Sequence, residues 1–144
     1  MASHPIHQHP SRRAAVALLE AAGLPVADLT DAHMRHFFYC GPTSALTGLV
    51  GVEFRGEDAL LRSLAVLPDR RSTGLGAALV DHAEGHARSR GARSLFLLTT
   101  TAEEYFRRRG YRSISRDEAP SEIRSTREFA DICPASSAFM VKTL

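Results

Sequence analysis

The stretch Leu64-Ala-Val-Leu-Pro-Asp-Arg-Arg71-Ser-Thr-Gly74-Leu-Gly76 decides the fold, because it leads from a strand into a long helix through a glycine-containing loop. On its N-terminal side, residues 59–67 alternate in the way that a β-strand requires. On its C-terminal side, apolar residues recur every four positions from Leu75 to Ala87, which predicts an amphipathic helix. The N–H groups at such a helix start converge on anions, and glycines let a phosphate approach the backbone. An ordinary strand–helix turn is the alternative interpretation.

The loop does not match the two most widespread phosphate-binding motifs. GxxxxGK followed by Ser or Thr is absent from the chain, and so is GxGxxG. The loop instead carries the pattern R-x-x-G-x-G, which begins at Arg71. We therefore expect an anion to be held by six consecutive residues, namely Arg71, Ser72, Thr73, Gly74, Leu75 and Gly76.

The elements around this loop predict one mixed α/β domain that spans residues 1–144, with residues 1–10 frayed. We expect helices over 12–22, 28–34, 75–90, 102–109 and 121–129. We expect strands over 36–40, 46–55, 59–67, 94–99, 111–115 and 138–144. The strands 46–55 and 59–67 form a hairpin, and the fully apolar strand 94–99 is typical of a buried parallel strand.

Composition limits the possible functions. The net charge is only +2, so there is no strong electrostatic case for binding nucleic acid, and Arg107-Arg-Arg109 is read as a solvated helix end. No apolar run reaches the roughly 20 residues of a membrane helix, and the N-terminus lacks the apolar core of a signal peptide. We therefore expect a cytoplasmic protein. Cys40 and Cys133 are expected to be buried or free thiols rather than a disulfide.

The pattern L-A-V-x-P-D-R-R-x-x-G-x-G resembles the pyrophosphate loop of the GNAT acetyltransferases, and a second signature supports the resemblance. In that family a polar residue, an Ala, an aromatic and then Gly-Phe or Gly-Tyr follow the fifth strand. Here Thr99, Ala102, Phe106 and Gly110-Tyr111 stand at those positions. The likeness spans residues 11–144 and implies a mixed central sheet with splayed strands flanked by helices.

The resemblance also implies acetyl-CoA as the cosubstrate, with no metal. Arg71 to Gly76 would hold the CoA pyrophosphate, while Leu64 and Val66 would pair their backbones with the pantetheine arm. The Leu64 N–H would also steady the oxyanion of the reacting carbonyl. The expected cofactor-binding residues outside the loop are Leu64, Ala65, Val66, Thr99, Phe106 and Arg109.

Two family residues are missing. Many GNAT enzymes place a Tyr acid four residues before the second-signature Gly and a Glu base early in the fourth strand. This chain has Phe106 and Leu60 at those positions, and Tyr105 would point about 100° away on a helix. Glu53 on the neighbouring strand is then the candidate base. A solvated Glu53 paired with Arg55 or Arg62 is the alternative.

Arg62 is the candidate contact to an anionic acceptor. It is expected to share a strand face with Leu60, Leu64 and Val66, and that face looks into the acceptor site of GNAT enzymes. A buried Arg on an apolar face is costly unless an anion meets it. Further substrate contacts are expected from Thr100, Arg124 and Arg127. A solvated helix face is the alternative for the last two.

The segments 61–66, 99–101, 123–129 and 133–140 resemble the ArsN group, which acetylates the α-amine of arsinothricin and, less well, phosphinothricin. The resemblance implies a small anionic amino acid as acceptor and a role in resistance. The alternatives are a GNAT enzyme for another amino acid, a polyamine or a peptide amine, or a catalytically silent module that binds acyl-CoA. A homodimer is left open.

Two further signals are rejected. His82 and His86 stand one helical turn apart, but in the order HxExH rather than HExxH and without a third ligand nearby, so we expect surface residues and no metal. No serine lies in a GxSxG context, so a serine hydrolase is not supported.

Overall fold

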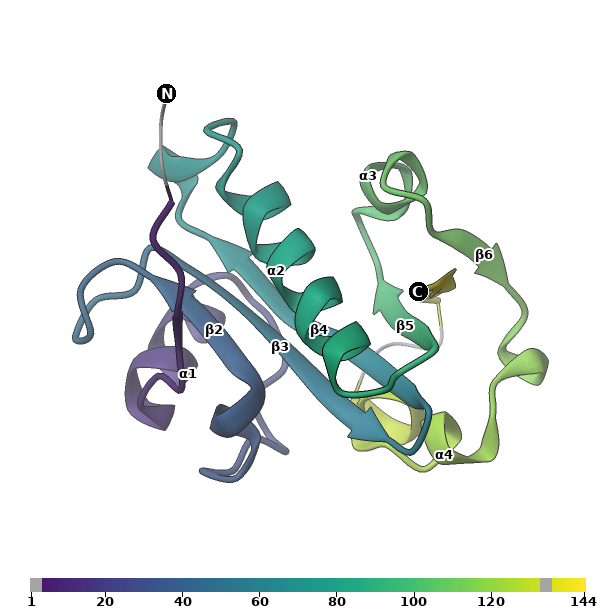
Figure 1. Ribbon diagram of the computed structural model, residues 1–144. Coiled ribbons are helices and arrows are strands. Elements are labelled where there is room, and N and C mark those ends of the chain that lie inside the picture. Colours follow the sequence, from purple (N-terminus) through teal and green to yellow (C-terminus); the bar gives the residue numbers. More distant parts are fainter. Residues whose placement is uncertain (1–3, 133–135) are drawn as a thin grey trace.

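The computed structural model describes residues 4–132 and 136–144 of the chain (Figure 1). Cys133 and part of the 133–140 segment therefore lie outside the described residues. The helices and helical turns are α1 (Arg12–Ala21), η1 (His33–His36), η2 (Pro68–Arg70), α2 (Leu75–Ser89), α3 (Glu103–Arg108), η3 (Arg116–Glu118), α4 (Ser121–Arg124) and η4 (Glu128–Ile132). The strands are β1 (His7–Gln8), β2 (Phe37–Cys40), β3 (Gly48–Arg55), β4 (Asp58–Val66), β5 (Ser94–Thr99), β6 (Arg112–Ile114) and β7 (Ala138–Thr143).

The seven strands form one sheet in the order β1-β2-β3-β4-β5-β7-β6. Strands β4 and β5 are parallel, and every other neighbouring pair is antiparallel. Helix α2 covers one face of the sheet, where its apolar side packs on β3 and β4 through residues such as Leu79 and Ala83 (Figure 1). Helices α1 and α4 pack on the other face. The fold is thus the mixed α/β domain that the sequence predicts.

A β-bulge interrupts β4 at Ser63. Leu49 of β3 pairs with Ala65 and Gly51 pairs with Arg62, so β4 contains one more residue than its partner between these pairs. Ser63 takes a positive φ of 59°, which is uncommon for a residue other than glycine. Such an extra residue shifts every later side chain to the opposite face of the sheet.

This bulge corrects the expected face of Arg62. Leu64 and Val66 pack on the α2 side of the sheet, whereas Leu60 packs on the α4 side. Arg62 lies on the side of Leu60, because the extra residue comes after it. The strict alternation read from the sequence assumed a regular strand, and it placed Arg62, Leu64 and Val66 on one face.

Strands β4 and β5 separate soon after they meet. Their ladder contains only residues 58–60 of β4 and 94–96 of β5, at the end where both strands begin. Beyond it the two strands diverge, as Figure 1 shows to the right of α2. The remaining backbone of both strands therefore has no partner across this gap in the sheet, and a ligand with an extended chain can lie there.

Three of the expected elements differ from the sequence prediction. The helix expected over 121–129 is divided into α4 and the separate turn η4. Residues 28–34 were expected to form a helix, and Thr30 is a residue type that often caps one, but only the 3₁₀ turn η1 forms. Thr30 does not cap a helix, because both its N–H and its hydroxyl contact Nδ1 of His33. The expected frayed end is also corrected in part, since His7 and Gln8 pair with Tyr39 and Phe38 of β2 as a short edge strand.

No helix within the described residues has the length and apolar character needed to cross a membrane. The thiol of Cys40 is buried against the core, and burial raises its pKa. A protonated, enclosed thiol of this kind is expected to be inert, in agreement with the sequence interpretation.

Candidate active site between strands β4 and β5

A cavity of about 570 Å³ opens where β4 and β5 diverge. Its walls come from both strands, from the loop after β5, from the start of α3 and from the turn after α1. Of the residues expected to bind cofactor or substrate, five line it: Arg62, Leu64, Thr99, Thr100 and Phe106. The fold thus brings these five residues together at one cavity.

The glycine loop has the conformation that an anion site requires. Gly74 caps α2 with a φ of 86°, a left-handed conformation that side chains rarely adopt. A Cβ built on Gly76 would meet nothing closer than the Tyr105 hydroxyl at 3.6 Å and a Val66 methyl at 3.9 Å. A Cβ here would thus make ordinary contacts without a clash, and α2 is long enough for its first N–H groups to attract a phosphate.

The arginines and hydroxyls of the loop make mostly local contacts. Nε of Arg71 donates to the Val66 carbonyl over 3.3 Å, and the Thr73 hydroxyl donates to the Arg70 carbonyl over 2.6 Å. Both bonds tie the loop to its own backbone and hold its curvature. Ser72 also has a positive φ, of 66°. Ala65, by contrast, is buried on the α1 side of the sheet, so only its backbone can serve a ligand.

Arg109 and Tyr105 extend the site from α3 toward the glycine loop. A guanidinium N–H of Arg109 donates to Asp81 of α2, while its Nε is buried with no hydrogen-bond partner in the described part of the chain. A buried donor without a partner is rare and points to a missing acceptor. The glycine backbone at the start of α2 and this donor fit the phosphates and pantetheine of CoA, the cosubstrate that the family resemblance implies.

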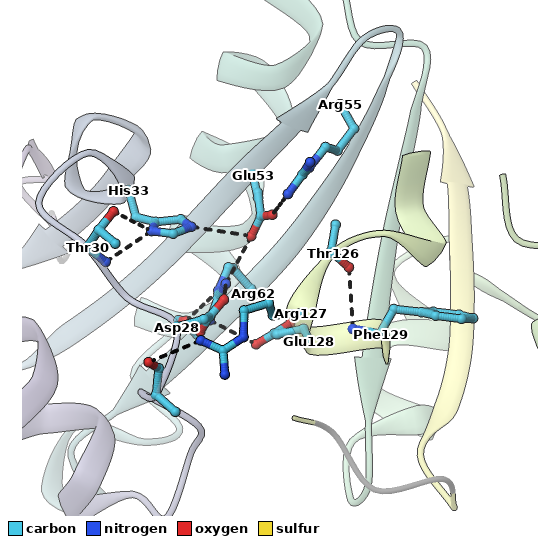
Figure 2. Close-up of polar contacts among 12 residues, drawn as sticks. Asp28, Thr30, His33, Glu53, Arg55, Arg62, Thr126, Arg127, Glu128 and Phe129 are labelled. Atoms are coloured by element: carbon cyan, nitrogen blue, oxygen red, sulfur yellow. Dashed lines mark hydrogen bonds and ion pairs between the residues drawn. The ribbon is translucent and has the colours of Figure 1, made fainter. Parts of the chain in front are cut away.

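Arg62 is enclosed by three carboxylates (Figure 2). Its guanidinium binds both oxygens of Asp28 at 2.6 and 2.8 Å, and it binds Glu53 at 2.9 Å. Glu128 forms a longer ion pair with it, at 3.3 Å. Its side chain has no solvent exposure, and the three acids raise its pKa further above the ordinary value against the effect of burial. The expected open anion clamp is therefore replaced by an arginine whose charge is already balanced.

Glu53 is a poor proton acceptor in this setting. It is buried, and it accepts from Arg55 at 2.7 Å as well as from Arg62, with His33 at 3.7 Å. Burial opposes ionisation, but these contacts outweigh it and lower the pKa of Glu53 to about 2. The sequence analysis offered two alternatives for Glu53, a general base or a solvated residue paired with Arg55 or Arg62. In the structure the carboxylate is paired with both arginines and is buried.

Glu128 has the opposite character. It begins η4 and is 4% exposed, and among the described residues that line the cavity it is the one carboxylate. Burial raises the pKa of Glu128 to about 7, and the positive charge of Arg62 only partly offsets this. Thr126 fixes the start of this turn, because its hydroxyl donates to the Ile123 carbonyl and accepts from the Phe129 N–H.

The other two candidate arginines do not line the cavity. Arg124 donates to the carbonyls of Ala119 and Asp117, so it closes its own preceding loop. Arg127 is exposed and donates to the Ala27 carbonyl at 3.5 Å, beside the Arg62 cluster. The hydroxyl of Thr99 accepts from the Ala102 N–H and thereby shapes the turn into α3.

Sequence reasoning missed Asp28, Ser63, Glu128 and Ser137. Ser137 lines the cavity, is 7% exposed and has a hydroxyl oxygen with no hydrogen-bond partner among the described residues. Asp28 and Glu128 lie far from Arg62 in the chain. The sequence offered one signal for these acidic residues, the free-energy cost of burying the Arg62 charge. That cost can be offset by carboxylates of the protein as well as by an anionic ligand.

One of the two histidines that the sequence analysis rejected as a metal site, His86, belongs to a hydrogen-bonded pair in the structure. His36, which the sequence analysis did not consider, lies near His86, with Nδ1 and Nε2 at 3.1 Å. Burial lowers the pKa of both imidazoles, as expected for a neutral hydrogen-bonded pair. His82 is exposed, as the sequence predicts, whereas His86 is partly buried. Ligand atoms of Asp28, His33 and Glu53 also lie within 4.8 Å of one another, but Arg62 already occupies this cluster as its cation.

Comparison with known proteins identifies the family. Residues 5–115 match the model of the acetyltransferase (GNAT) family, and the chain therefore belongs to this family of acetyltransferase enzymes. An uncharacterised N-acetyltransferase of Chlorobaculum tepidum is 34% identical over 117 residues, which cover 78% of this chain and 73% of that protein.

Two further relatives are much longer than this chain. An amino-acid acetyltransferase of Pseudomonas syringae pv. tomato is 40% identical over 73 residues, which cover 51% of this chain and 17% of the relative. The structure of N-acetylglutamate synthase from Neisseria gonorrhoeae, in complex with coenzyme A and N-acetyl-glutamate, superposes with a TM-score of 0.83 and 26% identity. That superposition covers all of this chain and 36% of the synthase.

Proposed function

We propose that this protein transfers the acetyl group of acetyl-CoA to the α-amine of a small amino acid. One observation carries the proposal. The cavity lies along the edges where β4 and β5 no longer pair, and Phe106 of α3 lines it. The adjacent Tyr105 of α3 approaches Gly76 in the glycine loop at the start of α2. A cosubstrate held by the loop would thus lie with its thioester end against the cavity, where an amine can attack it.

The polar groups of the cavity suit an amino acid as the acceptor. Glu128 offers a carboxylate for the α-ammonium, while the hydroxyl groups of Thr100 and Ser137 can donate to the acceptor carboxylate. The names of the Pseudomonas and Neisseria relatives support an amino-acid acceptor. Because Arg62 is already paired, we do not assign it a contact with the acceptor.

Within this class we propose arsinothricin, and less well phosphinothricin, as acceptors. The support is the resemblance of residues 61–66, 99–101 and 123–129 to the ArsN group. Both compounds are glutamate analogues, so a site for either one must accept an α-ammonium, an α-carboxylate and a second anionic group. Glutamate is therefore the natural reference compound in any test.

The experiment is a thiol-release assay with acetyl-CoA and a panel of amines. The panel contains glutamate, phosphinothricin, arsinothricin, an apolar amino acid, spermidine and a peptide with a free N-terminus. Rapid thiol release with amino acids supports the proposal, and a preference for spermidine contradicts it. No release with any amine, together with tight CoA binding, would identify the catalytically silent module instead.

Ser137→Ala tests the acceptor site separately. A buried hydroxyl without a partner costs about 1–3 kcal/mol, so its removal should leave the free protein as stable as before or more stable. If the hydroxyl serves the acceptor, the same change should raise KM for the amino acid about two- to tenfold without affecting CoA affinity. Ser125→Ala, at an exposed site on the end of α4, is the matched control.

A further inference from the structure

Three carboxylates surround Arg62, but they differ in what else they touch. Asp28 engages the guanidinium with both of its oxygens, at 2.6 and 2.8 Å. Glu53 divides its two oxygens between Arg62 and Arg55, at 2.9 and 2.7 Å. Each of these two carboxylates therefore has both oxygens committed to an arginine.

Glu128 is the least engaged of the three. Its contact with Arg62 is an ion pair at 3.3 Å, longer than those of Asp28 at 2.6 Å and Glu53 at 2.9 Å, and it is the carboxylate that faces the cavity among the described lining residues. Figure 2 shows it on the side of Arg62 away from His33 and Arg55. A proton on an acceptor amine in the cavity can reach Glu128, whereas Glu53 does not line the cavity.

Charged groups from several elements surround Glu128. Arg62 of β4 forms an ion pair with it, His33 adds a weaker positive field when it is protonated, and Arg127 lies beside it in Figure 2. The carboxylates of Asp28 and Glu53 oppose ionisation of Glu128. Because these two acids already balance Arg62 and Arg55, the third carboxylate receives little net stabilisation, and it is a stronger proton acceptor than either of the others.

We propose that Glu128 is the proton acceptor for the amine in this reaction, and that Arg62, held by Asp28 and Glu53, is the residue that positions it. This inference rests on the proposed acetyl transfer and adds to it the identity of the base. It replaces Glu53, whose basicity is too low for the task, and it needs no residue at the family position occupied by Leu60.

The step balances with the groups present. The ammonium gives one proton to the Glu128 carboxylate, which later returns it to water. The freed lone pair on nitrogen forms the C–N bond, the C–S bond breaks, and its electron pair leaves on sulfur. The second proton lost by nitrogen passes to that sulfur, so the products are the N-acetyl amino acid and the CoA thiol. A thiol of ordinary pKa, about 8.5, can leave as thiolate without a strong acid.

The test compares Glu128→Gln with the wild type and with Glu122→Gln, a control at an exposed position of α4. Glu128→Gln keeps the shape of the side chain and loses its basicity, so kcat should fall about 10²- to 10⁴-fold. The pH profile of kcat/KM in the wild type should decline below about pH 7, where Glu128 takes up its proton. That decline should be absent in Glu128→Gln and unchanged in Glu122→Gln.

A measurement without turnover completes the test. Carbon NMR of glutamate carboxyl groups in the free protein, assigned with Glu128→Gln, should show this carboxyl titrating near pH 7. Titration near 4.5, or wild-type kcat/KM in a folded Glu128→Gln protein, would overturn the inference while leaving acetyl transfer intact. A wild type that binds CoA but acetylates no amine would overturn both proposals together.

Discussion

The guanidinium of Arg62 donates two hydrogen bonds to the two carboxylate oxygens of Asp28, at 2.6 and 2.8 Å. These residues are 34 positions apart, and the pair joins the loop after α1 to the middle of β4. The contact is two-pronged and excluded from water, which makes it a strong and geometrically specific ion pair. Arg62 thereby holds the surrounding carboxylates in place and stabilises the wall of the cavity.

The first prediction concerns Arg62→Ala. Three buried carboxylates would lose their shared cation, so the free energy of unfolding should fall by about 3–5 kcal/mol at pH 7.5. Chemical denaturation measures this directly. Arg62→Lys should recover part of the loss, since an ammonium cannot reproduce the two-pronged contact with Asp28. A stable Arg62→Ala protein whose sole defect is a higher KM for an anionic acceptor would restore the anion-clamp interpretation.

The second prediction concerns acid stability. The pKa of Glu53 is about 2 in the folded protein and has an ordinary value of 4.5. Its ionised form therefore stabilises the fold at pH values above 4.5, and this contribution is lost as the pH falls from 4.5 toward 2. The pKa of Asp28 is lowered as well, so it acts in the same direction.

Glu53→Gln should accordingly lower the free energy of unfolding by about 3 kcal/mol at pH 7, and less at pH 3. Denaturant titrations at several pH values check this. The pH range in which Glu53 affects stability differs from that of Glu128. The pKa of Glu128 is raised to about 7, so its contribution to the free energy of unfolding decreases as the pH rises from 4.5 to 7. Equal losses at pH 7 and at pH 3 would show that Glu53 is not ionised as described.

The third prediction concerns the glycine loop. Gly76→Val would place a side chain beside the backbone that is expected to hold the pyrophosphate, with no contact closer than 3.6 Å for its Cβ. The fold should survive, and the Kd for CoA should rise about tenfold or more. Gly85→Val is the matched control, because Gly85 lies in the same helix and its Cβ would meet nothing within 4 Å. Calorimetry that gives equal CoA affinities for both variants would remove the loop from the site.

The fourth prediction separates Phe106 from Tyr105. Phe106 is 5% exposed and packs edge-to-face on Tyr111, so Phe106→Leu should cost about 1 kcal/mol of stability and keep most of kcat. The Tyr105 hydroxyl lies 3.6 Å from a Cβ built on Gly76, and Tyr105 is not among the residues that line the cavity. Tyr105→Phe should therefore raise the Kd for CoA about threefold and leave kcat unchanged. A collapse of kcat in Tyr105→Phe, measured by thiol release, would instead assign the leaving-group acid to Tyr105.

The sequence was sufficient for the elements that local pattern determines. The hairpin of β3 and β4, the glycine loop and the amphipathic α2 follow from alternation, helical periodicity and two glycines. The strand β1 and the segment 28–34 were harder to predict from the sequence. A two-residue strand and a 3₁₀ turn are too short to show a hydrophobic period.

The acceptor site was less accessible to sequence reasoning for two physical reasons. No glycine or proline in the sequence indicates the bulge at Ser63. The bulge nevertheless moves the side chains that follow it in β4 to the opposite face of the sheet. The partners of Arg62 come from β3, from the loop after α1 and from η4, so their convergence is a property of the tertiary fold. The basicity of Glu128 and Glu53 depends on that convergence and could not be ranked beforehand.

The most direct test of the account uses acetyl-CoA with a radiolabelled acetyl group and glutamate, phosphinothricin or arsinothricin as acceptor. The account predicts that the label moves to the amino acid in an amount equal to the thiol released, with the acetyl group on the α-nitrogen by mass spectrometry. Label recovered as free acetate, or still bound in the thioester after prolonged incubation with every acceptor, would contradict acetyl transfer to an amino acid.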